Sequence, residues 1–274
     1  MLKVQITRLR KLLFCSTLIG ALCLAASPIA FAFTAQQTVS GWVSALKRND
    51  VKSALLLGTT PEEYLDLRKQ LAADFSDTPE SNARFAEDFA DLLAPDASLR
   101  LFAQIKPHLA EVNGYSAMFA SIADSALEEL GSADASDKLT PEQLASAREV
   151  LNALKSWAAR TDFGDEKRAL AAIDAVVNAF RAANIKSASD WAKLSDDARI
   201  AKLNFVLQAV KGITKAYDLN IDNLLGSIVV SAGKAPDQSE VRIGYKVFEA
   251  RGSSIFKMFQ REGEWFFWDS SLLK

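Results

Sequence analysis

The sequence has almost none of the residues that nucleophilic and metal chemistry uses. Among its 274 residues there are one histidine, His108, and two cysteines, Cys15 and Cys23. A Ser-His-Asp or Cys-His arrangement would have to use His108, and no G-x-S-x-G motif accompanies it. A histidine-based zinc site needs more than one such ligand, and the 12 glycines form no phosphate-binding loop. The sequence therefore predicts no catalytic residue, no metal ligand and no cofactor.

Residues 1–32 have the pattern of a cleaved secretory signal peptide. A basic start precedes an apolar run at 12–26, and the small residues of Ala30-Phe31-Ala32 are those that signal peptidase reads. The apolar run is short for a membrane span, and the cleavage site follows it directly. We therefore expect cleavage before Phe33 and no stable membrane anchor afterwards.

Cleavage would change both the charge and the cysteine content of the chain. The leader holds four of the 32 basic residues and none of the 34 acidic ones, so the mature chain, 33–274, has a net charge of −6. This charge argues against nucleic acid as a partner. The mature chain also lacks cysteine and cannot form a disulfide. We expect a single mature domain in the periplasm, with secretion as the second possibility.

Residues 33–220 have the pattern of a multi-helix bundle. Threonine followed by proline and glutamate predicts helix starts at Thr60, Thr78 and Thr140. Apolar residues spaced by three and four predict the helices themselves. The expected ranges are 34–48, 50–57, a helix starting at 60, 78–93, 96–112 with a bend near Pro107, 115–130, helices starting at 140 and 165, 189–194, and one long helix over 196–217.

After Ile221 the apolar pattern changes to the alternation that is typical of strands. Between 241 and 248 every second residue is apolar, which predicts a half-buried strand. Further strands are expected at 225–232, 255–260 and 265–268, with a turn at 250–253. The predicted fold class is α+β and predominantly helical, a multi-helix bundle packed on a C-terminal three- or four-stranded antiparallel meander over 221–274.

Two blocks at the ends of the mature chain, "SALKRNDVKSALLL" and "REGEWFFWD", resemble the NTF2-like (cystatin-like α+β) superfamily. That resemblance implies a sheet that curls around helices and encloses a pocket. The stretches "LKSWAARTDFGD" and "AYDLNIDNLLGSIVV" resemble a family of uncharacterised exported proteins of proteobacteria, which implies export. Neither resemblance assigns a functional residue.

Carboxylates are plentiful, but their spacing indicates no site. The segment Asp218–Asp222 resembles the start of a calcium loop, yet the loop's glycine and its bidentate glutamate are both absent. Glu87 and Asp91 would share one helix face, whereas neighbours such as Asp196 and Asp197 diverge around the helix axis. We expect these residues to form solvated helix faces.

The last expected strand is rich in aromatic residues. Alternation places Trp265 and Phe267 on one face and Phe266 and Trp268 on the other, so both faces would be apolar. One interpretation is a central strand that is covered on both sides. The other is that Trp265, Phe267 and Tyr245 line a ligand site, with Trp265 facing the ligand and Phe266 in the core.

These observations favour an exported, non-catalytic protein that binds a small apolar ligand or an envelope protein. An enzyme hypothesis, a pocketed hydrolase or isomerase, would require buried carboxylates, or an aspartate and a tyrosine, to converge in a pocket. A third hypothesis is a structural or inhibitory interaction module, which would show a flat apolar surface on its helices.

Overall fold

The computed structural model describes residues 33–73, 77–112, 114–132, 139–235, 237, 239–261 and 263–267. Its helices are α2 (Ala35–Lys47), α3 (Val51–Gly58), α4 (Pro61–Ala73), α5 (Pro79–Leu93), α6 (Ala97–Ile105), η1 (Lys106–His108), α7 (Leu109–Val112), α8 (Tyr115–Glu129), α10 (Pro141–Arg160), α11 (Glu166–Ala183), α12 (Ala188–Ala192), α13 (Asp196–Lys202), α14 (Asn204–Ala216) and α15 (Ile221–Ser227). Its strands are β1 (Val229–Ala232), β2 (Glu240–Val247), β3 (Ala250–Lys257), β4 (Phe259–Arg261) and β5 (Glu264–Phe266). The predicted class, a mainly helical α+β fold with a C-terminal antiparallel sheet, is confirmed.

The helix starts that the threonines predict are confirmed, because each threonine bonds to an N–H group that the first turn leaves free. Thr140 begins α10 with a reciprocal capping box: its hydroxyl accepts the N–H of Gln143, whose side chain accepts the N–H of Thr140. Thr60 and Glu63 bond to one another in the same way at the start of α4. Thr78 caps α5 through its side chain.

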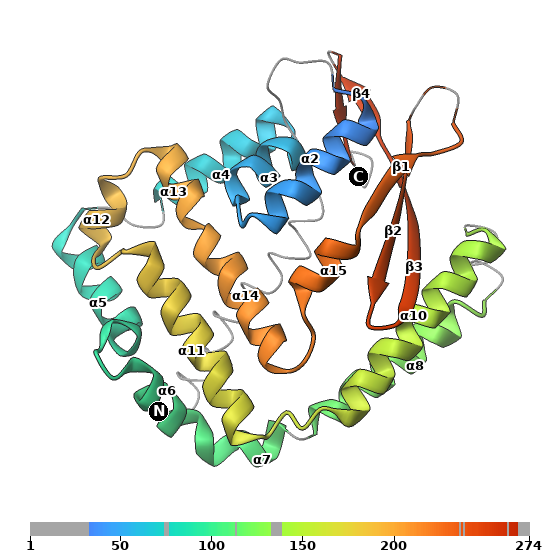
Figure 1. Cartoon of the computed structure of the whole chain (residues 1–274). Coiled ribbons are helices and arrows are strands. Elements are labelled where there is room, and N and C mark those ends of the chain that lie inside the picture. Colours follow the sequence, from blue (N-terminus) through green and yellow to red (C-terminus); the bar gives the residue numbers. More distant parts are fainter. Residues whose placement is uncertain are drawn as a thin grey trace.

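Helices α11 and α14 lie side by side in the middle of the helical part (Figure 1). They approach so closely that Gly212 of α14 has no room for a side chain. A Cβ on Gly212 would lie 2.3 Å from the Cβ of Ala175 on α11. Helices α5 and α6 pack on α11, and α3 packs on α14, so this helix pair joins two parts of the hydrophobic core.

Helix α2 joins the helical part to the strands. Its Val39 is buried in one cluster with Val241 of β2, so the first described helix and the sheet share a core. At the other end of α2, the buried Lys211 of α14 donates to the carbonyl of Leu46 at 2.8 Å and pairs with Asp222 at 2.7 Å. An ammonium group at these last carbonyls complements the negative end of the helix dipole.

The strands form two sheets instead of one meander. One sheet has the antiparallel order β1-β2-β3, and β4 pairs with β5 in a separate hairpin. The turn expected at 250–253 is wrong, because these residues begin β3 and Val247 pairs with Ala250 across Phe248-Glu249. Gly252 belongs to the strand, where the ring of Tyr245 on the paired residue of β2 covers it.

One helix expectation and one strand expectation need correction near α14. The long helix expected over 196–217 breaks at Leu203, and Asn204 then accepts the N–H of Val51 at the start of α3. The strand expected from residue 225 begins only at Val229, because Asn220 caps α15 in front of it. Asn220 thus caps the helix that follows it, whereas Asn204 bonds to the N-terminus of a different helix, α3.

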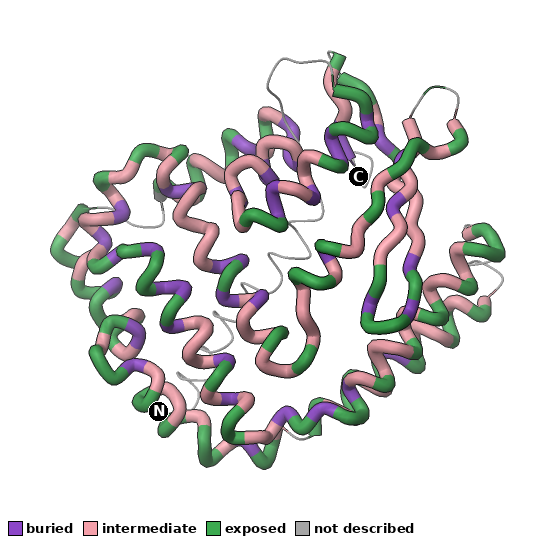
Figure 2. The backbone as a smooth tube through the Cα atoms, in the orientation of Figure 1, coloured by how far each residue is buried: buried purple, intermediate pink, exposed green. Residues whose placement is uncertain are grey.

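Helices α8 and α10 form a helical hairpin beside the sheet, which we call the arm (Figure 1). Helix α10 lies along β3, the edge strand of the three-stranded sheet. Ser146 accepts the N–H of Ser253 at 2.6 Å, and Glu149 accepts the N–H of Arg251 at 3.1 Å. These bonds satisfy backbone N–H groups of β3 that, at the edge of a sheet, have no neighbouring strand to accept them. In Figure 2 the arm is mostly exposed or intermediate, and Ala123 is the one buried residue of α8.

Candidate interaction surface

The three residues predicted to face a ligand lie around one hydrophobic cluster between α2 and the two sheets. Phe267 is 5% exposed, and its ring centroid lies 5.4 Å from that of Trp42 and 5.5 Å from that of Phe256. Tyr245 is half-buried and covers Gly252, and Trp265 is half-buried on the β4–β5 hairpin. Each ring therefore has a packing role, and ligand binding by Tyr245 and Trp265 stays a prediction.

The aromatic strand expected at 265–268 ends at Phe266. Phe266 is buried, which confirms its expected place in the core, and Trp268 lies outside the described residues. Phe267 follows the strand, so the alternation of strand faces no longer governs it, and it packs into the same cluster as Phe266. The structure therefore places Phe267 in the core instead of on an open face beside Trp265.

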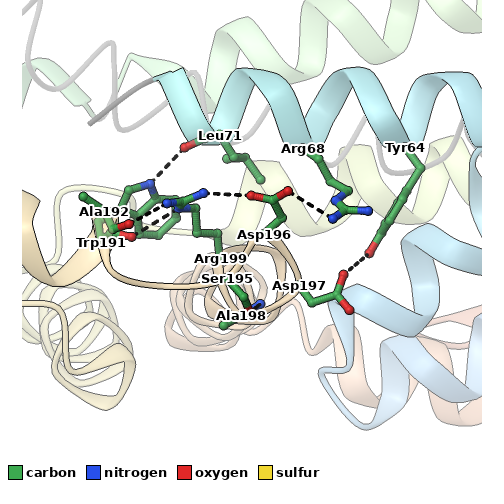
Figure 3. Close-up of polar contacts among 10 residues, drawn as sticks. All are labelled: Tyr64, Arg68, Leu71, Trp191, Ala192, Ser195, Asp196, Asp197, Ala198 and Arg199. Carbon is green, nitrogen blue, oxygen red and sulfur yellow. Dashed lines mark hydrogen bonds and ion pairs between the residues drawn. The ribbon is translucent and has the colours of Figure 1, made fainter. Parts of the chain in front are cut away.

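A polar cluster joins α4 to the start of α13 (Figure 3). The carboxylate of Asp196 lies 3.0 Å from Arg68 and 2.8 Å from Arg199. The remaining donors of the buried Arg199 bond to the carbonyls of Trp191 at 3.1 Å and Ala192 at 2.8 Å. Asp196 was expected on a solvated helix face, yet it links two helices and the end of α12.

Asp197 and Tyr64 are the kind of pair that the enzyme hypothesis requires. The Tyr64 hydroxyl lies 3.5 Å from one oxygen of Asp197, and Lys52 lies 2.8 Å from the other. The hydrogen bond from Lys52 holds the pKa of Asp197 below its usual range, while burial and then the charge of Asp197 raise the pKa of Tyr64. The two pKa values move away from neutrality, which is the opposite of the shift that a general acid or base at pH 7 requires. The contacts of this cluster fit a structural role, in which they hold α3 and α4 against α13.

The other candidate ligands of the sequence do not converge. His108 lies on the short helix η1, with Nδ1 at 3.6 Å from Glu111. Asp218 pairs with Arg168, and Asp222 pairs with Lys211. Among the described residues, no group of three or more His, Cys, Asp or Glu side chains is placed to hold a metal ion.

A shallow pocket of about 380 Å³ opens between the end of α11 and α12. Three lysines, Lys186, Lys193 and Lys202, contribute to its lining. Lys202 already donates to the carbonyl of Ala183 at 2.5 Å, and Asp190 accepts the N–H of Lys186 at 3.0 Å. A lining with three amines is a poor match for a small apolar ligand.

Five aromatic side chains meet at the base of the arm, and we call them the aromatic junction. Its rings follow one another at centroid distances of 5.4–6.5 Å, which is the range of favourable aromatic pairs. The indole N–H of Trp157 donates to the carbonyl of Tyr217 at 2.6 Å, which ties α10 to the end of α14. The members are Phe119, Trp157, Phe163, Tyr217 and Phe248.

Phe248 enters this junction from the β2–β3 turn with a φ of 55°. Left-handed backbone is unusual for a bulky residue and costs of order 1–3 kcal/mol. The turn therefore holds an aromatic ring against Trp157 at a position where glycine is the easier residue. This contact adds a second attachment between the sheet and α10.

One side of α8 carries a row of exposed apolar side chains, which we call the α8 face. Tyr115 is 48% exposed, Met118 45%, Phe119 38% and Ile122 57%. Their spacing of three, four and seven residues places them on one side of the helix. Phe119 stands at the border of this row, because its ring also contacts Trp157 and Phe163. A contiguous exposed apolar row on a helix is typical of a protein-binding surface.

The sequence signal for the α8 face was present but ambiguous. Spacing alone predicts an amphipathic helix over 115–130 and does not tell whether another element covers its apolar side. No protein-family model, curated protein or solved structure matches the chain. The resemblances to the NTF2-like superfamily and to exported proteobacterial proteins stay predictions. Among the described residues, no helix has both the length and the apolar character to cross a bilayer.

Proposed function

We propose that this protein is an exported, non-catalytic binding protein of the periplasm whose partner is another envelope protein, bound through the α8 face. The observation that carries the proposal is the row formed by Tyr115, Met118 and Ile122, each of them close to half exposed or more. Export rests on the signal-peptide pattern of residues 1–32. An exposed helix face favours a protein partner over a small apolar ligand, because a small ligand needs a concave site.

The partner test removes the apolar side chains and leaves the fold intact. Met118→Ser/Ile122→Ser exchanges two exposed apolar residues of α8, and Leu65→Ser/Leu99→Ser is the matched control on α4 and α6, with side chains 48% and 65% exposed. Both variants should keep a melting temperature close to that of the wild type, since exposed positions contribute little burial. Cross-linking in intact cells, followed by mass analysis, should give a complex with the wild type and the control only. Equal complexes from both double variants would refute this use of the α8 face.

The export test is independent of the partner test. Intact-mass analysis of the protein from a periplasmic extract should give a chain that begins at Phe33, after Ala30-Phe31-Ala32. A chain that still begins at Met1 and remains in the cytoplasm would refute export, and with it the proposal that the partner is an envelope protein.

A further inference from the structure

The end of α8 carries charges that are unfavourable for the helix itself. Glu128 and Glu129 lie in its last turn, and α8 has no basic residue. The free carbonyls of a last turn carry partial negative charge, so carboxylates there weaken the helix and basic residues strengthen it. Residues that are unfavourable for their own helix are expected at functional sites, such as a contact with a partner.

Glu129 continues the α8 face. It follows Ile122 by seven residues, which is about two helical turns, so it lies on the same side as Tyr115, Met118 and Ile122. The α8 face is thus an apolar row that ends in a carboxylate, with Glu128 beside it.

The neighbouring basic side chains of α10 are engaged elsewhere. Arg148 donates to the carbonyl of Leu130 at 3.0 Å, and Lys155 pairs with Asp124. Both contacts hold α10 to α8, so these cations already serve the packing of the arm. Glu128 and Glu129 themselves are exposed at the end of the apolar row.

We infer that the partner binds the α8 face with a basic amphipathic helix. This inference rests on the proposed function and names its partner by chemistry: a helix with an apolar stripe at i, i+3, i+4 and i+7, and with Lys or Arg beside the stripe. The stripe packs on Tyr115, Met118 and Ile122, and the basic side chains meet Glu128 and Glu129. Charge complementarity of this kind fixes the register and direction of the bound helix.

The α8 face of a second copy does not have this chemistry. Two-fold symmetric, antiparallel pairing of α8 with its copy, centred on the row 115–122, would place Glu128 and Glu129 opposite Leu109 and His108 of the copy, close to Glu111. The stretch 109–129 has four acidic residues, Glu111, Asp124, Glu128 and Glu129, and no basic one. The two basic residues just before this stretch are already engaged, because Lys106 pairs with Glu166 at 2.8 Å and His108 Nδ1 lies 3.6 Å from Glu111. Such a dimer would therefore offer Glu128 and Glu129 no unengaged lysine or arginine.

The inference can be tested with two synthetic helices of about 18 residues, long enough to form several turns on binding. Both carry the same leucine stripe, flanked by lysine in one peptide and by glutamate in the other. Titration of the mature wild-type protein at low salt should show that the lysine peptide binds at least about tenfold more tightly, and added salt should reduce the difference. Met118→Ser/Ile122→Ser should lose the lysine peptide as well.

A charge-reversal variant then tests the role of the two glutamates. Glu128→Lys/Glu129→Lys should reverse the preference, while Glu80→Lys/Glu249→Lys, which changes two exposed acidic residues elsewhere, should keep it. The melting temperature of Glu128→Lys/Glu129→Lys should be at least that of the wild type, because lysine suits a last turn. A reversed preference therefore cannot come from unfolding.

The outcomes separate this inference from the proposed function. If both peptides bind equally and both are lost in Met118→Ser/Ile122→Ser, the inference of a basic partner is overturned, while the α8 face remains a binding site. Lysine-peptide binding that persists in Met118→Ser/Ile122→Ser would overturn both, since charge alone would then act. The inference of a basic helical partner would also be overturned if neither peptide binds. The same holds if the wild type sediments as a dimer that Ile122→Ser dissociates.

Discussion

Replacement of Gly212 by alanine tests whether the contact between α11 and α14 is as close as the structure shows. The added Cβ would lie 2.3 Å from the Cβ of Ala175 and 3.5 Å from its Cα. Carbon atoms in ordinary contact are about 3.5–4.0 Å apart, so the two helices would have to separate by roughly 1.2 Å or more. Both helices also pack on other elements, which resist such a movement.

The expected magnitude follows from two opposing terms. Overpacking at a close contact costs about 1–3 kcal/mol. Alanine is a better helix former than glycine by up to about 1 kcal/mol, which offsets part of this cost. Gly226→Ala on α15 provides the control, because a Cβ there has no neighbour within 4 Å and gains from helix propensity alone. We therefore expect Gly212→Ala to be less stable than Gly226→Ala by about 1–3 kcal/mol.

Urea unfolding of the mature chain, followed by circular dichroism, measures both free energies of unfolding. A double-mutant cycle with Ala175→Gly makes the test specific, since removal of the opposing methyl group restores the space that Gly212→Ala fills. The double variant should be more stable than the sum of the two single changes predicts. If Gly212→Ala is as stable as Gly226→Ala, or if the two changes simply add, the close contact between the helices is refuted.

Three further predictions concern polar groups. Ser146→Ala should destabilise the protein by about 1–2 kcal/mol in urea unfolding, because the Ser253 N–H loses its partner at the sheet edge, while Ser156→Ala on the same helix should have little effect. Asp197→Asn should lower the melting temperature at pH 7. The difference should shrink as the pH falls below the ordinary value of 3.8 and vanish below the lowered pKa of Asp197 in the folded protein, because a lowered pKa stabilises the fold only while the carboxylate is ionised. Lys211→Met should cost about 1–3 kcal/mol in urea unfolding, since a buried donor to the end of α2 is lost, and an unchanged stability would contradict that role.

The helical part was predictable because helix starts are local. Thr140 and Gln143 form a complete capping box from residues three positions apart, so the sequence alone identifies where α10 begins. The break at Leu203 was not predictable in this way. The break adjoins a long-range contact, in which Asn204 accepts the N–H of Val51, a residue far away in the sequence and near only in the fold.

The same distinction explains the error in the sheet. Gly252 in the segment 250–253 looks like a turn residue, but in the fold it lies in a strand under the ring of Tyr245. The actual turn places Phe248 in left-handed backbone, for which the sequence gives no usual signal such as glycine or asparagine. Strand pairing decides both positions, and strand pairing is not local.

The candidate site was hidden for a related reason. Phe85, Phe89 and Leu92 on α5 have the same spacing as Tyr115, Phe119 and Ile122 on α8. On α5 the row is covered by α11 and the rest of its cluster, whereas on α8 it remains open. Periodicity predicts an apolar stripe equally well in both helices, and only the packing of the whole chain tells which stripe is available to a partner.

The attachment of the arm explains how α8 can keep an open apolar face. Ser146 and Glu149 fasten α10 to the edge of the sheet, and the hydrogen bond from Trp157 to Tyr217 fastens its base to α14. Helix α8 is thus ordered by its contact with α10 before any partner arrives, so binding does not carry the entropic cost of folding a helix. It follows that substitutions at Met118 and Ile122 should change binding with little change in stability, whereas loss of the Trp157 side chain should reduce both.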